Sequence, residues 1–181
     1  MTTIGIAEYE TPLGAAMGAT QDGKLVALTF SDRWNEMEAR LIRRLGSFKR
    51  QTAGGLQTRL HAYFAGDMNA FDQIEVNPGG TAFQAAVWAK LRRIPPGSTT
   101  TYSALAHAIG SPKAVRAVGA ANGANPIWLI IPCHRAIGSD GSLTGYAGGI
   151  ERKRWLLEHE RRFTAVDGGE QSAMEVSSVL A

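Results

Sequence analysis

The chain has 181 residues, of which 44% are hydrophobic and 19% are charged, and its formal net charge is +3. This composition excludes general disorder, and the longest apolar run, Pro126 to Cys133, is too short for a membrane span, which needs about 20 residues. A single cysteine excludes an internal disulfide framework and a multi-cysteine zinc site, and the first residues show no secretory signal, so we expect a cytoplasmic protein without a metal.

The first third of the chain is predicted to form strands followed by helices. Turn signals such as Asp22-Gly23 separate three short segments that are typical of hairpin strands: Ile4–Tyr9, Ala15–Thr20 and Lys24–Phe30. Asp32 is predicted to cap a helix that runs to about Leu45, and a second helix is expected from Leu56 to Phe64, ending at Gly66. We therefore expect an α/β domain with an antiparallel sheet.

The charge balance changes at the best linker candidate, Asn77-Pro-Gly-Gly80. Residues 1–78 carry a net charge of −1, residues 79–162 a net charge of +7, and residues 163–181 a net charge of −3. We expect an N-terminal domain over 1–78, a second domain over 79–162 and an acidic, flexible tail over 163–181. The basic segment suggests a polyanion partner, although a solvated basic surface would explain the charge equally well.

Beyond the linker, the sequence predicts mostly helices. Thr81 is predicted to cap a helix that ends before Pro95-Pro96-Gly97, and a short helix is expected over Thr101–Ile109. Ser111-Pro112 is predicted to open the next helix, with Ser as the cap and Pro at the first helical position. These two helices are typical of a helix-turn-helix, and an ordinary helical hairpin is the alternative.

The end of the chain combines a strand, a loop and a helix. The apolar run Ile127–Ile131 is interpreted as a strand, and a glycine-rich loop over Gly138–Gly149 follows it. A terminal helix is expected from Glu151 to about Arg162. We therefore expect an α+β protein whose second half is mainly helical.

The only thiol lies in the sequence Pro132-Cys-His-Arg135. A free cysteine is most often a buried structural residue. Here, however, His134 offers a base that titrates near physiological pH, and Arg135 adds a cation that favours the thiolate. Adjacent strand residues point to opposite faces, so either the chain turns at Pro132 or a water molecule carries the proton between Cys133 and His134.

The context of this cysteine resembles the active-site segment of O6-alkylguanine-DNA alkyltransferases, also called methylated-DNA–protein-cysteine methyltransferases. The resemblance is dense over residues 81–162 and weak over 1–80. Its motifs include Asn125-Pro-Ile-Trp-Leu-Ile-Ile-Pro-Cys-His-Arg135, Phe83-Gln-Ala-Ala-Val-Trp88, Thr101-Tyr-Ser103, Ala117-Val-Gly-Ala-Ala-Asn-Gly123 and Arg152-Lys-Arg-Trp-Leu-Leu-Glu-His-Glu160. Ala136 stands where the family usually has a branched aliphatic residue.

This resemblance implies a fold and a reaction. The implied fold has a ribonuclease-H-like N-terminal domain and a helix-turn-helix of the winged-helix type. Cys133 would attack the alkyl carbon on O6 of a damaged guanine, in a single turnover and without a cofactor. His134 would take the thiol proton through water, and Glu160 would orient the imidazole. The choice of Glu160 over Glu158 rests on the resemblance.

The same resemblance assigns the remaining roles. Asn125 would brace the cysteine turn, Tyr102 would contact the flipped guanine, and Tyr146 and Ala147 would line the base pocket. The implied partner is double-stranded DNA bound through its minor groove, with the protein as a monomer. Its contacts are predicted at the following residues: Arg116, which would enter the space vacated by the base, Lys113, Ala117 and Arg135.

Two other function classes stay open on the residues alone. A non-catalytic helix-turn-helix DNA-binding or damage-sensing protein would share the basic segment but would not need Cys133. A cysteine hydrolase would use the Cys-His pair, yet Cys133 and His134 are sequence neighbours and no oxyanion signature is evident. Transfer of a label from DNA to the protein would separate the alkyl acceptor from both.

Overall fold

Three N-terminal strands form most of a four-stranded sheet. The computed structural model describes the backbone of residues 4–52 and 54–179, and it describes the side chains of residues 4–52 and 54–165. The strands β1 (Ile4–Tyr9), β2 (Ala16–Gln21) and β3 (Lys24–Phe30) pair antiparallel, as the turn signals predicted. Asp22 and Gly23 both have positive φ, which the tight hairpin turn requires.

The fourth strand corrects the expectation of a purely antiparallel sheet. Strand β4 (Phe48–Arg50) pairs parallel to β1 at the edge of the sheet, which has the order β3-β2-β1-β4. The chain crosses over through α1 before it returns, and such a crossover makes the returning strand parallel. With only three residues, β4 is too short to show a pattern of alternation in the sequence.

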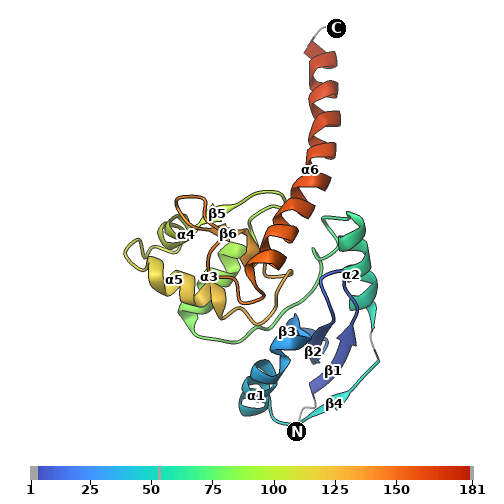
Figure 1. Ribbon diagram of the computed structural model, residues 1–181, viewed down its shortest axis with the longest axis vertical. Coiled ribbons are helices and arrows are strands. Elements are labelled where there is room, and N and C mark those ends of the chain that lie inside the picture. The colour runs from blue at the N-terminus through green and yellow to red at the C-terminus, as the bar shows by residue number, and fades with distance from the viewer. Residues whose placement is uncertain (1–3, 53, 180–181) are drawn as a thin grey trace.

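Helix α1 (Trp34–Leu45) covers one face of this sheet (Figure 1). It buries Trp34, Met37 and Leu41 among sheet residues such as Val26. A single 3-10 turn, η1 (Ser31–Arg33), precedes the helix, and no side chain caps α1. The predicted cap at Asp32 is therefore wrong, because this carboxylate instead accepts a hydrogen bond from Arg152 over 2.9 Å.

Helix α2 (Gly55–Ala65) lies on the other side of the strands (Figure 1). Gly66 ends it in a left-handed conformation with φ of 113°, which confirms the predicted stop. The buried residues of α2 are Leu60 and Tyr63. This helix therefore directs a tyrosine toward the C-terminal half of the molecule.

The C-terminal half contains helices α3 (Ala82–Leu91), α4 (Tyr102–Ala108) and α5 (Val115–Gly123). Thr81 caps α3 in a capping box with Gln84, as the sequence predicted in part. Helix α5 starts later than expected. Ser111 does not cap it and Pro112 is not its first residue, because a turn over 111–114, with Ala114 N–H bonded to Ser111 C=O, fills that interval.

The apolar run Ile127–Ile131 is not a strand. It contains one isolated bridge, between Leu28 and Ile127, and then a turn in which Leu129 has φ of 64°. The backbone bond from Ile131 N–H to Ile127 C=O closes this turn. The run is apolar because it is buried on all sides rather than because it belongs to a sheet.

The remaining elements lead to a long terminal helix. The 3-10 helix η2 (Cys133–Arg135) is followed by β6 (Ala136–Ile137), which pairs with β5 (Thr100–Thr101). Helix α6 (Ile150–Val179) continues well past Arg162, so the predicted end is wrong. The side chains from residue 166 onward lie outside the described part, and the predicted flexibility of the tail stays untested there.

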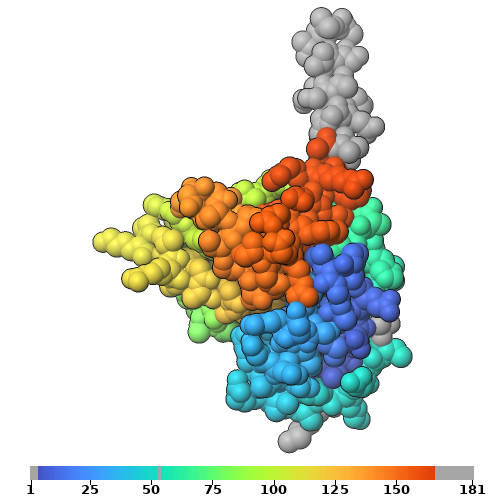
Figure 2. Space-filling model, viewed as in Figure 1, coloured from blue at the N-terminus to red at the C-terminus, as the bar shows by residue number. Residues whose placement is uncertain are grey.

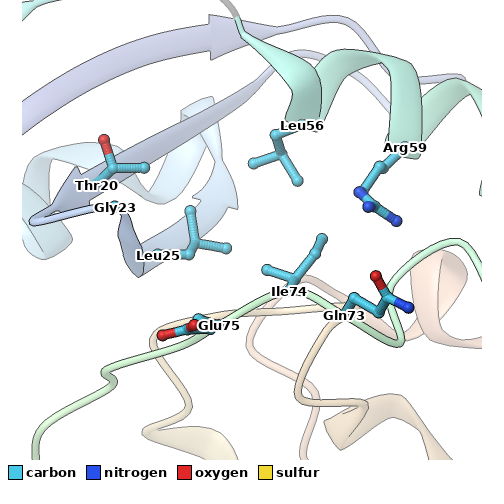
Figure 3. A pocket seen from close by; sticks show the side chains of 8 residues that line it. All are labelled: Thr20, Gly23, Leu25, Leu56, Arg59, Gln73, Ile74 and Glu75. Carbon is cyan, nitrogen blue, oxygen red and sulfur yellow. The ribbon is translucent and has the colours of Figure 1, made fainter.

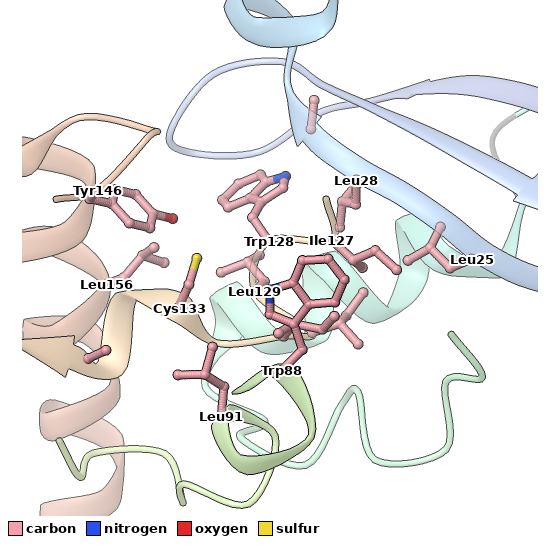
Figure 4. Packing of buried hydrophobic residues seen from close by; sticks show 14 of the residues in the cluster. Leu25, Leu28, Trp88, Leu91, Ile127, Trp128, Leu129, Cys133, Tyr146 and Leu156 are labelled. Carbon is pink, nitrogen blue, oxygen red and sulfur yellow. The ribbon is translucent and has the colours of Figure 1, made fainter. Parts of the chain in front are cut away.

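One hydrophobic cluster contains residues from both halves of the chain. Leu28, Trp88 and Ile127 belong to it (Figure 4), and so do Phe30 and Tyr63. Whether 1–78 and 79–162 act as two domains stays a prediction. Across the residues described, no helix combines the length and the apolarity needed to cross a membrane.

Candidate active site

Cys133 lies directly after the turn in the apolar segment, at the start of η2, with 6% of its surface exposed. Asn125 holds this turn, because its Nδ2 donates to Ile131 C=O over 2.7 Å and its Oδ1 accepts from Ile127 N–H over 2.9 Å. These bonds are the bracing that the resemblance implied. Sequence reasoning missed Asn122, whose Nδ2 donates to Cys133 C=O over 3.3 Å.

His134 and Glu160 form a buried pair beneath the cysteine. Their side chains are 0% exposed, and His134 Nε2 lies 2.7 Å from Glu160 Oε1. An ionised carboxylate can only accept, so the imidazole carries its proton on Nε2 and leaves Nδ1 free to accept one. Within the described part of the chain, Nδ1 has no hydrogen-bond partner. Glu158, the alternative carboxylate, is exposed.

The electrostatics of this pair favour a neutral imidazole and an ionised carboxylate. Burial lowers the pKa of His134, and the neighbouring Glu160 only partly offsets this effect. Burial raises the pKa of Glu160, but the opposing effects of His134 and Arg135 outweigh it and hold this pKa far below its usual range. His134 is therefore available as a base at neutral pH.

The Cys133 thiol is protonated at rest. Its pKa is raised by burial, while a hydrogen bond with the Asn125 side chain and the charge of Lys153 act in the opposite direction. Arg135 is not the cation that acts on the thiol. The chain does turn at Pro132, yet no direct hydrogen bond joins the thiol and the imidazole among the described groups, so a water-mediated path stays the prediction.

Arg135 does not lie where a DNA contact would require it. Its side chain is 8% exposed, its Nε and Nη2 donate to Glu160 over 2.9 and 2.8 Å, and Nη1 donates to Ile94 C=O. The prediction that Arg135 binds DNA is therefore wrong. A buried carboxylate needs a paired cation, and Arg135 supplies it.

Lys153 is a site residue that the sequence reasoning missed. It is fully buried, and its Nζ donates to Ala136 C=O over 2.6 Å and to Thr144 C=O over 2.9 Å. Burial lowers its pKa to about 8. A signal was present: Lys153, Leu156, Leu157 and Glu160 recur at the spacing of one helix face, and all four are buried.

A pocket opens beside Cys133, and its walls come from both halves of the chain. Figure 4 shows the sulfur between Tyr146 and Trp128. Tyr146 and Ala147 line this pocket, and its use as the pocket for the base stays a prediction. Tyr146 is buried with a hydroxyl that has no partner among the described atoms. Phe30 of β3 also lines it, with its ring centroid 3.7 Å from that of Trp128.

Tyr102 lies next to this pocket, at the start of α4. Its hydroxyl donates to Thr144 C=O over 2.9 Å, and Lys153 Nζ is 5.8 Å from the centre of its ring. Burial raises the pKa of Tyr102. The phenol therefore keeps its proton at neutral pH.

The candidate DNA contacts lie on an outer edge of the molecule. Arg116 and Ala117 are exposed on α5, whereas Val118 and Ala121 of the same helix are buried. Lys113 is also exposed, but it lies in the turn before α5 and not on the helix that carries Arg116. Figure 2 shows this segment, in yellow, protruding from the body of the protein.

A separate pocket of about 370 Å³ lies between the β2–β3 hairpin and α2 (Figure 3). Leu25, Leu56 and Ile74 line it together with Arg59 and Glu75. Among the side chains described, no group of His, Cys, Asp and Glu is arranged to hold a metal ion. Cys133, the only cysteine of the sequence, lies at the other pocket.

Comparisons with known proteins agree with this geometry. A family described as "6-O-methylguanine DNA methyltransferase, DNA binding domain" matches residues 82–162. A methylated-DNA–protein-cysteine methyltransferase of Salmonella typhimurium is 57% identical over 107 residues, which are 59% of this chain and 63% of that protein. The match thus spans less than two thirds of that relative.

Two further similarities cover most of the chain. A methylated-DNA–protein-cysteine methyltransferase of Mycolicibacterium paratuberculosis is 45% identical over 159 residues, which are 86% of this chain and 93% of that protein. A crystal structure of Mycobacterium tuberculosis OGT in complex with DNA is similar with a TM-score of 0.77 and 40% identity, covering 88% of this chain and 94% of the other.

Proposed function

This chain belongs to the methylated-DNA–protein-cysteine methyltransferase family, and we propose that it repairs DNA by transferring the alkyl group of O6-alkylguanine to its own Cys133. The observation that carries the proposal is the junction of one buried thiol, the His134–Glu160 pair and the pocket beside them. The proposal includes O4-alkylthymine as a second substrate of the same chemistry.

The reaction is a displacement at the alkyl carbon. The Cys133 sulfur forms a bond to that carbon, the bond from the carbon to guanine O6 breaks, and the electron pair leaves with the base. The product on the protein is a thioether. Water cannot displace a thiolate from it, so each chain acts once.

Proton movement prepares the nucleophile. The thiol is protonated at rest, so its proton passes through a water molecule to His134 Nδ1, which is unprotonated. The imidazolium that forms is stabilised by Glu160, 2.7 Å from Nε2. Lys153 adds positive charge near the thiolate.

The departing base receives help from the other side of the pocket. Tyr102 keeps its proton at neutral pH and would neutralise the guanine as it leaves. Tyr146 and Ala147 lie along the pocket wall that would hold the flipped base. No metal or organic cofactor takes part in these steps.

Access to the alkyl group requires the nucleotide to leave the duplex. Arg116 is exposed on α5 and would fill the vacated space, with Lys113 and Ala117 against the DNA. Small residues keep this helix thin, which suits the minor groove. The similar protein with a TM-score of 0.77 was crystallised in complex with DNA, which supports DNA as the partner here.

We also propose the finer assignments of fold and setting. The N-terminal sheet with its helices is of the ribonuclease-H-like type, α4 and α5 form a helix-turn-helix of the winged-helix type, and 1–78 and 79–162 are the two domains. The protein acts as a cytoplasmic monomer, since its thiol chemistry suits a reducing compartment.

The test is transfer of a radiolabelled methyl group from an O6-methylguanine duplex to the protein. The parent chain should become labelled at Cys133, and the Cys133→Ala variant should bind the duplex with similar affinity without acquiring label. DNA binding without label in the parent would instead favour a non-catalytic DNA-binding protein.

A further inference from the structure

Tyr63 connects the N-terminal half of the chain to the buried carboxylate of the active site. It lies on α2, is 1% exposed, and its hydroxyl donates to Glu160 Oε1 over 2.8 Å. The ring is held by Phe71, stacked at 4.9 Å between centroids, and by His159 at 5.3 Å. The position of the hydroxyl is therefore fixed by packing.

Tyr63 and His134 donate hydrogen bonds to the same oxygen of the Glu160 carboxylate. Glu160 Oε1 accepts from Tyr63, from His134 Nε2 at 2.7 Å and from Arg135 Nη2 at 2.8 Å. Oε2 accepts from Gly97 N–H at 3.2 Å and from Arg135 Nε at 2.9 Å. Each donor withdraws negative charge from the carboxylate, so each one limits how strongly the carboxylate attracts the proton of His134.

We propose that Tyr63 is a positioning residue of the transfer reaction, which sets the basicity of His134 through its hydrogen bond to Glu160. The proposal rests on the proposed function, because it assigns Tyr63 to that same relay. It also means that the reacting unit is not contained in residues 79–162, since α2 supplies one donor to it.

Other charged and titratable groups face this pair, and none of them replaces the Tyr63 hydroxyl. Arg135 and Lys153 act against protonation of His134, and Glu160 acts for it. Tyr146 also lies close enough to raise the pKa of Tyr63. Burial and the charge of Glu160 raise the pKa of Tyr63 well above its usual value, so it stays a donor throughout the working pH range.

The direct experiment is NMR titration of the His134 imidazole in the full chain, comparing the parent with Tyr63→Phe. Loss of the hydroxyl leaves Glu160 more negative, so the midpoint of the imidazole should rise by about half to one pH unit. The acid limb of the pH profile for methyl transfer should move upward by the same amount, because only the neutral imidazole accepts the thiol proton.

The matched control is Tyr9→Phe, which removes a hydroxyl from another buried tyrosine of the same core cluster that makes no bond to Glu160. Its midpoint should equal that of the parent. An unchanged midpoint in a folded Tyr63→Phe variant would overturn the proposal and reduce Tyr63 to a packing residue.

A second variant guards against loss of folding. Site-specific 3-fluorotyrosine at position 63 keeps the ring and makes the hydroxyl a stronger donor, so the His134 midpoint should fall. A midpoint that does not move, or that rises, would contradict the proposal. Because this titration needs no DNA, a shift without any methyl transfer would reject the proposed function, while the effect of Tyr63 on the basicity of His134 would stand.

Discussion

Five hydrogen bonds from four residues hold the Glu160 carboxylate, which is 0% exposed: one each from Tyr63, Gly97 and His134 and two from Arg135. An unpaired charge at such a depth would cost several kcal/mol, so the carboxylate depends on its partners. Arg135 is the partner that neutralises it. The stability of this region and the chemistry of His134 therefore both depend on the Glu160 carboxylate.

The first prediction concerns Arg135. Replacing Arg135 by Met leaves Glu160 buried without its cation and should lower the free energy of unfolding by about 3–5 kcal/mol. Urea titration at neutral pH measures this change. Arg93→Met, at an exposed position, is the control and should change the stability by less than about 0.5 kcal/mol. A loss at Arg135 as small as the control would mean that Glu160 is stabilised by other groups.

The second prediction concerns pH. Lys153 has a pKa of about 8, so it is charged at neutral pH and lowers the pKa of Cys133. Lys153→Met removes this charge, so the rate at which iodoacetamide alkylates Cys133 at neutral pH should fall, and the difference from the parent should shrink above the pKa of Lys153, about 8. Arg154→Met is the control. Arg154 is the next residue in the chain, but its side chain is exposed and pairs with Glu151. Equal alkylation rates at neutral pH in all three proteins would exclude Lys153 from the site.

At the scale of elements, the docking of α6 determines where Glu160 lies. A Cβ at Gly97 would collide with the Thr164 side chain, and one at Gly66 would collide with the Phe163 ring. Both glycines also have positive φ. The loops that follow α2 and α3 thus approach α6 so closely that only glycine fits.

The third prediction follows from this approach. Gly97→Ala should destabilise the protein by about 1–3 kcal/mol and slow methyl transfer, because both the strain and the collision with Thr164 move α6. Gly23→Ala is the control, because Gly23 has a similar positive φ but no atom lies within 4 Å of the added Cβ. Its loss of stability therefore measures the backbone strain without a collision. Thermal unfolding of both variants measures the difference. If the two lose the same stability, the contact with α6 contributes nothing.

The fourth prediction belongs to α5. Arg116→Ala should slow transfer from an O6-methylguanine duplex by about tenfold or more, because flipping costs a few kcal/mol, while the reaction with the free base O6-methylguanine stays unchanged. Arg43→Ala, an exposed arginine on α1, is the control for lost charge. Equal slowing on both substrates would make Arg116 a structural residue.

Local signals in the sequence predicted the elements that local chemistry determines. The Asp22-Gly23 hairpin, the Thr81 cap and the Gly66 stop depend on neighbouring residues alone, and they are confirmed. The edge strand β4 and the turn over 127–131 depend on distant partners. The three residues of β4 are too few to show a pattern, and the apolar run 127–131 is compatible with several structures, so packing decides in both cases.

The site shows the same division. The family motif pointed to Cys133, His134 and Glu160, and the structure brings the last two into contact. Tyr63 is 97 positions away from Glu160 in the sequence, so no spacing could reveal that bond. Arg135 was misassigned because a cation beside a reactive cysteine can either bind DNA or neutralise a buried carboxylate. Only its burial in the structure distinguishes these two roles.

At the scale of the whole molecule, one core joins the two halves around the reactive cysteine. Phe30 of β3 and Cys133 belong to the same hydrophobic cluster, and both line the pocket beside the thiol. Strand β3 also bonds to the apolar turn through Leu28. A change of volume at Cys133 must therefore be felt in both halves.

The fifth prediction is that repair weakens the fold. A methyl group on the buried Cys133 adds volume to a packed region, which typically costs about 1–3 kcal/mol. The spent protein should therefore melt at a lower temperature than the fresh protein. Calorimetry before and after reaction measures this, with Cys133→Ala mixed with the same DNA as the control. An equal melting temperature would mean that the pocket has room for the product.

The central claim is that Cys133 accepts one alkyl group and keeps it, and the stoichiometry of transfer tests it most directly. The protein is mixed with a large excess of O6-methylguanine duplex, and the mass of the intact chain and of its Cys133 peptide is followed over time. The account predicts a plateau at one methyl group per chain, located on Cys133, and no repair beyond that amount. Sustained repair of many duplexes per chain, or a methyl group on another residue, would contradict it.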